Sequence, residues 1–166
     1  MNIYLPTLSM KADAFVVKNP LETKNNYTKT NVDDAIYTLN LANKLSLEEL
    51  KGALKGYDFT SVSTNELSKI GSLLFENGLI DDVAAGFFTL GNMAFDETGH
   101  QTERDVKFNA IAMFNQMFEE RLVLGKSESA GFKELTRGLV RANHVVGALS
   151  YFANSTQTDL ALDIKA

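Results

Sequence analysis

The chain has 166 residues, two histidines and no cysteine, and its formal net charge at pH 7 is −5. This length suits one domain that buries a sizeable core without a metal or a disulfide, and the lack of cysteine excludes disulfides, thiolate nucleophiles and cysteine-based metal sites. The acidic charge disfavours general binding to nucleic acids or anionic membranes, because both present phosphates.

The compartment is predicted from what the chain lacks. No apolar run reaches the roughly 18 residues that a membrane-spanning helix needs, and the N-terminal sequence MNIYLPTLSMKADAFVV has neither a basic region nor a continuous apolar stretch. We therefore expect a cytoplasmic protein without a membrane span. The alternative is an exported structural or effector protein of a specialised secretion system, without a cleaved secretory signal.

Residues 1–30 differ in composition from the rest of the chain. They contain both prolines, Pro6 and Pro20, together with several turn-forming residues and more lysines than acids. This composition predicts an extended or poorly ordered arm. Its apolar residues leave two alternatives open: the arm lies on its own domain, or it inserts into a neighbour or serves as an export address.

From residue 31 onward, apolar residues recur at helical spacing. The pattern predicts a first helix over residues 31–44, capped by Asn31 or Thr30. Ser46 and Glu49 form the S-x-x-E pattern of a capping box, which predicts a second, short helix.

Residues 63–95 have the pattern of a helical hairpin. Ser63 and Glu66 form another capping box at the start of the first helix. Gly78 predicts the turn after it, because glycine adopts the left-handed conformation at little cost. Asp81 is placed to cap the second helix, which we expect to continue to about residue 95.

Two longer helices are predicted in the second half of the chain, over residues 102–124 and 130–153, with a loop between them. The apolar residues of the last helix fall at alternating three- and four-residue steps, which amounts to about three heptads of an a/d pattern. They are Phe132, Leu135, Leu139, Ala142, Val146 and Leu149.

The predicted fold class follows from these elements. We expect an all-α protein with five to six helices in a single bundle-like domain over residues 31–153. An extended N-terminal arm precedes the domain, and a frayed tail over residues 154–166 follows it. No strong strand candidate and no fixed-period repeat occurs in the sequence.

The charge of the hairpin argues against DNA binding. A helix-turn-helix protein inserts its second helix into the major groove, but the expected helix over residues 81–95 contains no lysine or arginine. Such a helix would bring a net negative surface to the phosphates. We therefore expect no nucleic-acid partner.

The hairpin combines a leucine-spaced first helix, a G-L-I turn and a second helix that begins with acids and carries an aromatic residue. The matching residues are Leu67, Ile70, Leu74, Gly78, Leu79, Ile80, Asp81, Asp82 and Phe87. In this, residues 63–88 resemble the SHOCT-type short helical domains of bacterial proteins. The resemblance implies a role in oligomerisation or interaction. The chain departs from the family pattern because the hairpin lies mid-chain and its second helix lacks the usual lysines.

The candidate catalytic or metal-binding residues are few. His100, Glu103 and Asp105 are close enough in sequence to suggest an enzymatic site, which we keep as an alternative. The two histidines, His100 and His144, lie far apart and no H-E-x-x-H motif is present, so the sequence predicts neither a zinc site nor a cofactor. The acidic loop after Asp96 does not have the ligand spacing of an EF-hand.

Two apolar faces are candidates for partner binding. The first is a methionine- and phenylalanine-rich face on the helix over residues 102–124, and methionine surfaces adapt to different partners. The second is the heptad face of the last helix. The residues concerned are Met113, Phe114, Met117, Phe118, Leu135, Leu139, Val146 and Leu149. The alternative for the first face is a central helix packed on two sides inside the domain.

The leading hypothesis is therefore a bacterial-type interaction or adaptor module without enzymatic activity. Its expected partner is another protein or a second copy of itself, so that a homo-oligomer is the expected state. The alternatives are the exported protein described above and an enzyme with a site near His100, Glu103 and Asp105.

Overall fold

The computed structural model describes the backbone of residues 10–41, 45–124 and 129–165, and the side chains of these segments as far as Ser155. The described residues contain no strand, and extended segments meet only at isolated bridges. The all-α prediction is confirmed. The helices are α1 (Val32–Leu39), α2 (Leu47–Ala53), α3 (Thr64–Glu76), α4 (Asp82–Leu90), α5 (Ala110–Leu124) and α6 (Ala130–Lys165).

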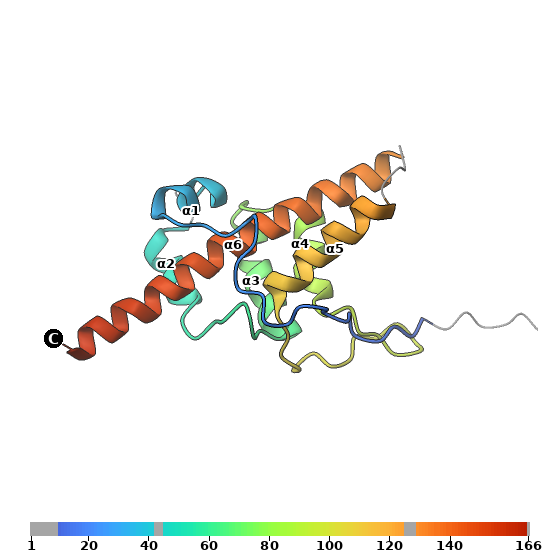
Figure 1. The fold of residues 1–166 in the computed structure, drawn as a ribbon, viewed down its shortest axis with the longest axis horizontal. Helices are drawn as coiled ribbons and strands as arrows, with labels where there is room; N and C mark the ends of the chain where they lie inside the picture. The colour runs from blue at the N-terminus through green and yellow to red at the C-terminus, as the bar shows by residue number, and fades with distance from the viewer. Residues whose placement is uncertain (1–9, 42–44, 125–128, 166) are drawn as a thin grey trace, which may run out of the picture.

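The long helix α6 is the axis of the fold (Figure 1). It packs against α1, α2, α4 and α5, whereas α3 packs on α4. The C-terminal end of α6 projects past the other helices, because the helix continues to Lys165, beyond the predicted end at Ala153. Among the described helices, none combines the length and the apolar character needed to cross a membrane.

Four helices begin at the caps that the sequence predicts. The side chains of Asn31, Ser46, Ser63 and Asp81 each accept a hydrogen bond from a backbone N–H in the first turn that follows. Such caps satisfy donors that have no partner within the helix. The first helix is shorter than predicted because the residue after Leu39 adopts a left-handed conformation; residues 42–44 of the predicted helix lie outside the described residues.

Helices α4 and α5 differ from the predicted hairpin and long helix. Helix α4 ends at Leu90 because Gly91 turns the chain with φ of +52° and packs against Thr64, where a Cβ atom would collide. The chain then stays irregular until Asn109, whose Oδ1 accepts the N–H of Ala112 at 3.0 Å and starts α5. The segment expected to open the long helix, residues 102–109, is therefore a connection.

All six described helices contribute buried residues to one core cluster. Its largest fully buried side chains include four phenylalanines, one each from the α2–α3 connection, α4, α5 and α6: Phe59, Phe88, Phe114 and Phe152. The rings of Phe88 and Phe114 lie 5.9 Å apart between centroids. Each such side chain stabilises the fold by about 1.5–3 kcal/mol through its burial.

Residues 10–30 lie along the domain in extended conformation and turns. Ala12 exchanges backbone hydrogen bonds with Phe95, at 3.0 and 2.8 Å. Farther along, Asn109 Nδ2 donates to the carbonyls of Pro20 and Glu22 at 2.9 and 2.7 Å. The N-terminal cap of α5 therefore also holds this part of the arm. Residues 1–9 lie outside the described residues.

Candidate functional site

Most of the predicted interaction residues belong to the core. Of the eight, five have an exposed fraction of 2% or less, and Met117 and Phe118 are half-buried against the same core. Inward packing was the alternative for the first face only, yet a partner would reach any of the five only if the domain opened. They are Met113, Phe114, Leu139, Val146 and Leu149. Leu135 alone of the eight is exposed, at 47%.

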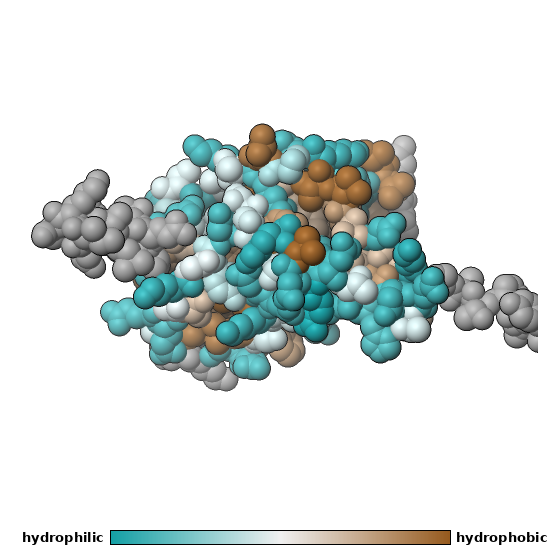
Figure 2. Space-filling view, turned by 90° about the horizontal axis from the view of Figure 1, so that it is seen from below, coloured by the Kyte–Doolittle hydropathy of each residue, from teal (hydrophilic) through white to brown (hydrophobic). Residues whose placement is uncertain are grey.

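Exposed aliphatic side chains gather instead at the end of α5 and the start of α6. Leu122, Val123 and Leu124 are 60%, 86% and 77% exposed, and they form the last residues of α5. Together with Leu135 they define the α5–α6 tip. Figure 2 shows hydrophobic side chains gathered on the side where α5 ends. Consecutive exposed aliphatics are unusual on a helix, whose apolar residues normally share one buried face.

Arg121 holds the two helices of the tip together. Its Nε donates to Thr136 Oγ1 and its Nη2 donates to the carbonyl of Phe132, both at 3.0 Å. The guanidinium also lies over the Phe132 ring, 4.3 Å from its centroid, which is a cation–π geometry. The last turn of α5 is therefore fixed against the first turns of α6.

Both signs of charge surround the α5–α6 tip. Helix α5 contributes Glu119 and Glu120, and α6 contributes Lys133, Glu134 and Arg137. Glu120 contacts Lys18 at 3.8 Å, an exposed pair that contributes little to stability. The second half of α5 thus carries two carboxylates, whereas the first turns of α6 carry both signs of charge.

The three alternative enzymatic residues have separate hydrogen-bond partners in the structure. His100 Nδ1 lies 2.6 Å from Thr98 Oγ1, whereas Asp105 accepts a hydrogen bond from Asn65 at 2.5 Å. Glu103 takes part through its backbone, because its carbonyl accepts a hydrogen bond from Asn92 Nδ2 at 3.0 Å. No hydrogen bond or ion pair joins any two of the three within the described part of the chain.

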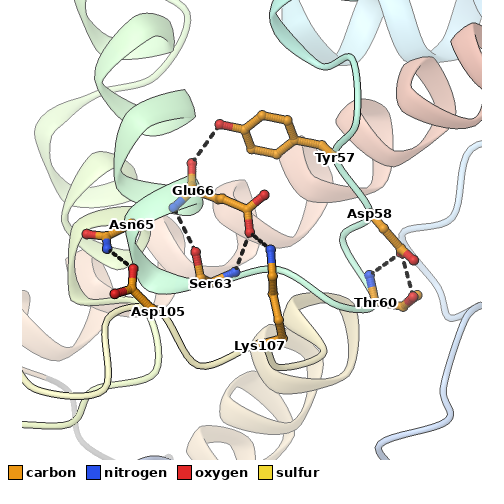
Figure 3. Close-up of polar contacts among 8 residues, drawn as sticks. All are labelled: Tyr57, Asp58, Thr60, Ser63, Asn65, Glu66, Asp105 and Lys107. Carbon is orange, nitrogen blue, oxygen red and sulfur yellow. Dashed lines mark hydrogen bonds and ion pairs between the residues drawn. The ribbon is translucent and has the colours of Figure 1, made fainter.

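The polar cluster at the start of α3 is structural (Figure 3). Glu66 receives hydrogen bonds from the Ser63 backbone at 3.1 Å and from Lys107, and its own N–H donates to Ser63 Oγ at 3.2 Å. Burial alone would raise the pKa of Glu66, but the hydrogen bonds from Lys107 and Ser63 outweigh it and lower that pKa. The cluster caps α3 and ties it to the connection that precedes α5.

His144 lies in a more buried, cationic setting on α6. Its Nδ1 is 3.2 Å from Lys29 Nζ, and its ring packs edge-on against Tyr27 with centroids 4.8 Å apart. Burial, then the charges of Lys29 and Arg141, lower the pKa of His144 below 6.5. A neutral imidazole therefore accepts the hydrogen bond that the Lys29 ammonium donates. Within the described residues, no group of three acidic, histidine or cysteine side chains is placed to hold a metal ion.

The comparisons with known proteins leave the chain without an assigned relative. No family model matches it, and neither the curated proteins nor the solved structures give a match. The structure does form a hairpin at the SHOCT-like residues, with Gly78 at φ of +71° between α3 and α4. The family resemblance itself stays a prediction.

Sequence reasoning missed most of the α5–α6 tip. Leu122, Val123 and Leu124 were not among the predicted interaction residues, although even the least exposed of them, Leu122, is 60% exposed. The run Leu122-Val123-Leu124 just before a predicted loop was the available signal, because apolar residues on all sides of a last turn cannot all face one core.

Proposed function

We propose that this chain is a self-associating interaction module and that two copies pair through the α5–α6 tip. The observation that carries the proposal is the exposure of Leu122, Val123 and Leu124 on a turn of helix that Arg121 fixes in place. Burying each aliphatic side chain in an interface would contribute about 1.5–3 kcal/mol. Three per copy, with Leu135, supply the apolar centre that stable interfaces have.

The rigidity of the tip favours association. A flexible apolar segment would lose conformational entropy when it docks, whereas a side chain on a fixed helix loses only its rotamer freedom. Arg121 on α5 makes two hydrogen bonds to α6, one to Thr136 and one to the Phe132 carbonyl. The surface is therefore preorganised for a partner.

The charges around the tip favour a second copy as the occupant. In a two-fold pairing each surface patch meets itself, so it must be self-complementary. If α5 of one copy faces α6 of the other, Glu119 and Glu120 of the first copy approach Lys133 of the second. A surface of one charge sign would repel its own copy, and this one carries both.

The test compares two substitutions at equally exposed positions. Val123→Asp places a charge in the tip, and Tyr37→Asp places the same charge on α1, where Tyr37 is 85% exposed against 86% for Val123. Solution mass is measured by size-exclusion chromatography with light scattering. We expect a dimer for the wild type and for Tyr37→Asp, and a monomer for Val123→Asp. A monomeric wild type, or a Val123→Asp variant that remains a dimer, would contradict the proposal.

A further inference from the structure

A cavity of about 460 Å³ lies between the turn at residues 23–29 and α6. In Figure 1 this turn belongs to the blue segment that precedes α1. Small-molecule sites have volumes of about 300–1,000 Å³, so the space is large enough for a metabolite. One face of α6 forms a wall, because the lining residues recur at helical spacing: Asn143, Val146, Gly147, Ser150 and Tyr151.

The turn over the cavity is fixed by its own hydrogen bonds. Asn25 Oδ1 accepts the N–H of Tyr27, and Thr28 Oγ1 accepts the N–H of Asn25, both at 2.9 Å. Asn25 Nδ2 reaches the Ile111 carbonyl at 3.4 Å. The turn comes so close to α6 that a Cβ atom added to Gly147 would lie 2.1 Å from the Tyr27 carbonyl oxygen. The turn that covers the cavity is therefore held in place before any ligand binds.

Asn143 presents an unused acceptor to the cavity. The residue is only 3% exposed, and its Nδ2 donates to the carbonyls of Phe114 and Leu139 at 2.9 and 3.1 Å. These two acceptors fix the amide orientation, since the flipped amide would set oxygen against oxygen. Oδ1 then has no hydrogen-bond partner among the described residues. Every side-chain nitrogen or oxygen of these residues that is sealed from solvent does have a partner, so Oδ1 faces open space. The open space that Asn143 borders is this cavity.

Two lysines supply positive charge at the same cavity. Lys24 and Lys29 both line it, and no carboxylate is among the lining residues that the structure describes. Lys29 also lines a second pocket beside α1 together with Asp34 and His144, and its ammonium group donates a hydrogen bond to His144 there. Two of the three N–H donors of that group remain for other partners. In a chain with a net charge of −5, this local excess of cations selects for a negatively charged ligand.

We propose that this cavity binds a small anion that also carries hydroxyl groups, the chemistry of a sugar phosphate or a sugar acid. The anionic group would contact Lys24 and Lys29, and a hydroxyl would donate to Asn143 Oδ1. An ion without hydroxyls, such as sulfate, leaves Asn143 Oδ1 without a donor and places oxygen against oxygen. A neutral sugar leaves the lysines unpaired. The ligand must therefore combine both features.

Titration calorimetry and backbone amide NMR of the full chain test the proposal. The probes are ribose 5-phosphate, glucose 6-phosphate and gluconate, with ribose and sulfate as partial probes. We expect at least one complete probe to shift the amides of Gly147 and Ser150, and to bind about tenfold or more tightly than either partial probe. If no complete probe binds, or if sulfate binds equally well, the proposal is overturned.

Two exposed lysines give a matched pair of variants. Lys24→Gln removes a charge from the cavity, and Lys133→Gln removes one from the exposed surface of α6. The first should weaken binding about tenfold and the second should leave it unchanged; equal effects would overturn the assignment of Lys24. Lipid head groups share the same chemistry, so vesicles of phosphatidylcholine with phosphatidylinositol form a further arm. Binding to these vesicles without binding to any free probe would overturn the proposal that the ligand is a soluble molecule.

Discussion

The close approach of Tyr27 to α6 predicts an unusual response to a Gly147→Ala substitution. Alanine is a better helix former than glycine by about 1 kcal/mol, so the exchange should stabilise an unconstrained helix. At this position the new Cβ would lie 2.1 Å from the Tyr27 carbonyl oxygen, whereas ordinary contact begins at 3.4 Å. The turn must therefore retreat by the difference, 3.4 − 2.1 = 1.3 Å.

That retreat opposes the hydrogen bonds that fix the turn. Asn25 is hydrogen-bonded to Tyr27, to Thr28 and to the Ile111 carbonyl. The turn therefore cannot shift without loosening these hydrogen bonds. Overpacking of this kind costs about 1–3 kcal/mol, and a collision with backbone belongs at the upper end. After the helix-propensity gain, we expect Gly147→Ala to lower the free energy of unfolding by about 1–2 kcal/mol.

Urea denaturation followed by far-ultraviolet circular dichroism measures this loss. Gly131→Ala is the matched control, because it lies in the same helix and its added Cβ has nothing within 4 Å. The control should be neutral or stabilising by up to about 1 kcal/mol. If Gly147→Ala raised stability in step with Gly131→Ala, the close packing of the turn on α6 would be refuted.

Three further predictions concern stability. Ser63→Ala removes the side-chain half of a capping box, the bond that the Glu66 N–H donates to Ser63 Oγ, and should cost about 1 kcal/mol in urea denaturation; an unchanged midpoint would contradict the cap. Phe88→Ala empties a fully buried ring site and should cost about 3–5 kcal/mol, so a loss below that of Ser63→Ala would contradict the core assignment. Burial, then Lys29 and Arg141, lower the pKa of His144 while Asp34 opposes them. The native state then binds fewer protons than the unfolded state, so stability should fall as the pH drops below 6.5 towards the folded-state pKa. His144→Gln should reduce this pH dependence, and an identical profile would contradict the linkage.

Local signals predicted the helix starts well. A side chain such as Ser63 or Asp81 caps the helix that follows it within four residues, so the sequence contains the whole interaction. The predicted start of α5 was wrong because the true start depends on a pairing between residues far apart in the sequence. Val62 and Phe108 exchange backbone hydrogen bonds at 2.9 and 2.8 Å, which holds the preceding residues out of a helix that their own pattern allows.

Periodicity predicted which face of α6 is apolar but not what covers it. Leu139, Val146 and Leu149 are buried as expected for one face, yet their neighbours are other helices of the same chain. A heptad pattern records burial and says nothing about whether the partner is intramolecular. The cavity at Asn143 was beyond sequence reasoning for a related reason, because Asn143 and Lys24 meet only through the fold.

The pairing of two copies through the α5–α6 tip is tested most directly by intermolecular distances in solution. Because the chain contains no cysteine, Leu124→Cys and Tyr37→Cys each introduce a single site for a nitroxide spin label. Pulsed electron–electron double resonance then reports label-to-label distances between copies. We predict a short, well-defined distance for Leu124→Cys and a longer one for Tyr37→Cys. The absence of an intermolecular signal from Leu124→Cys, or a shorter distance at Tyr37→Cys, would contradict the account.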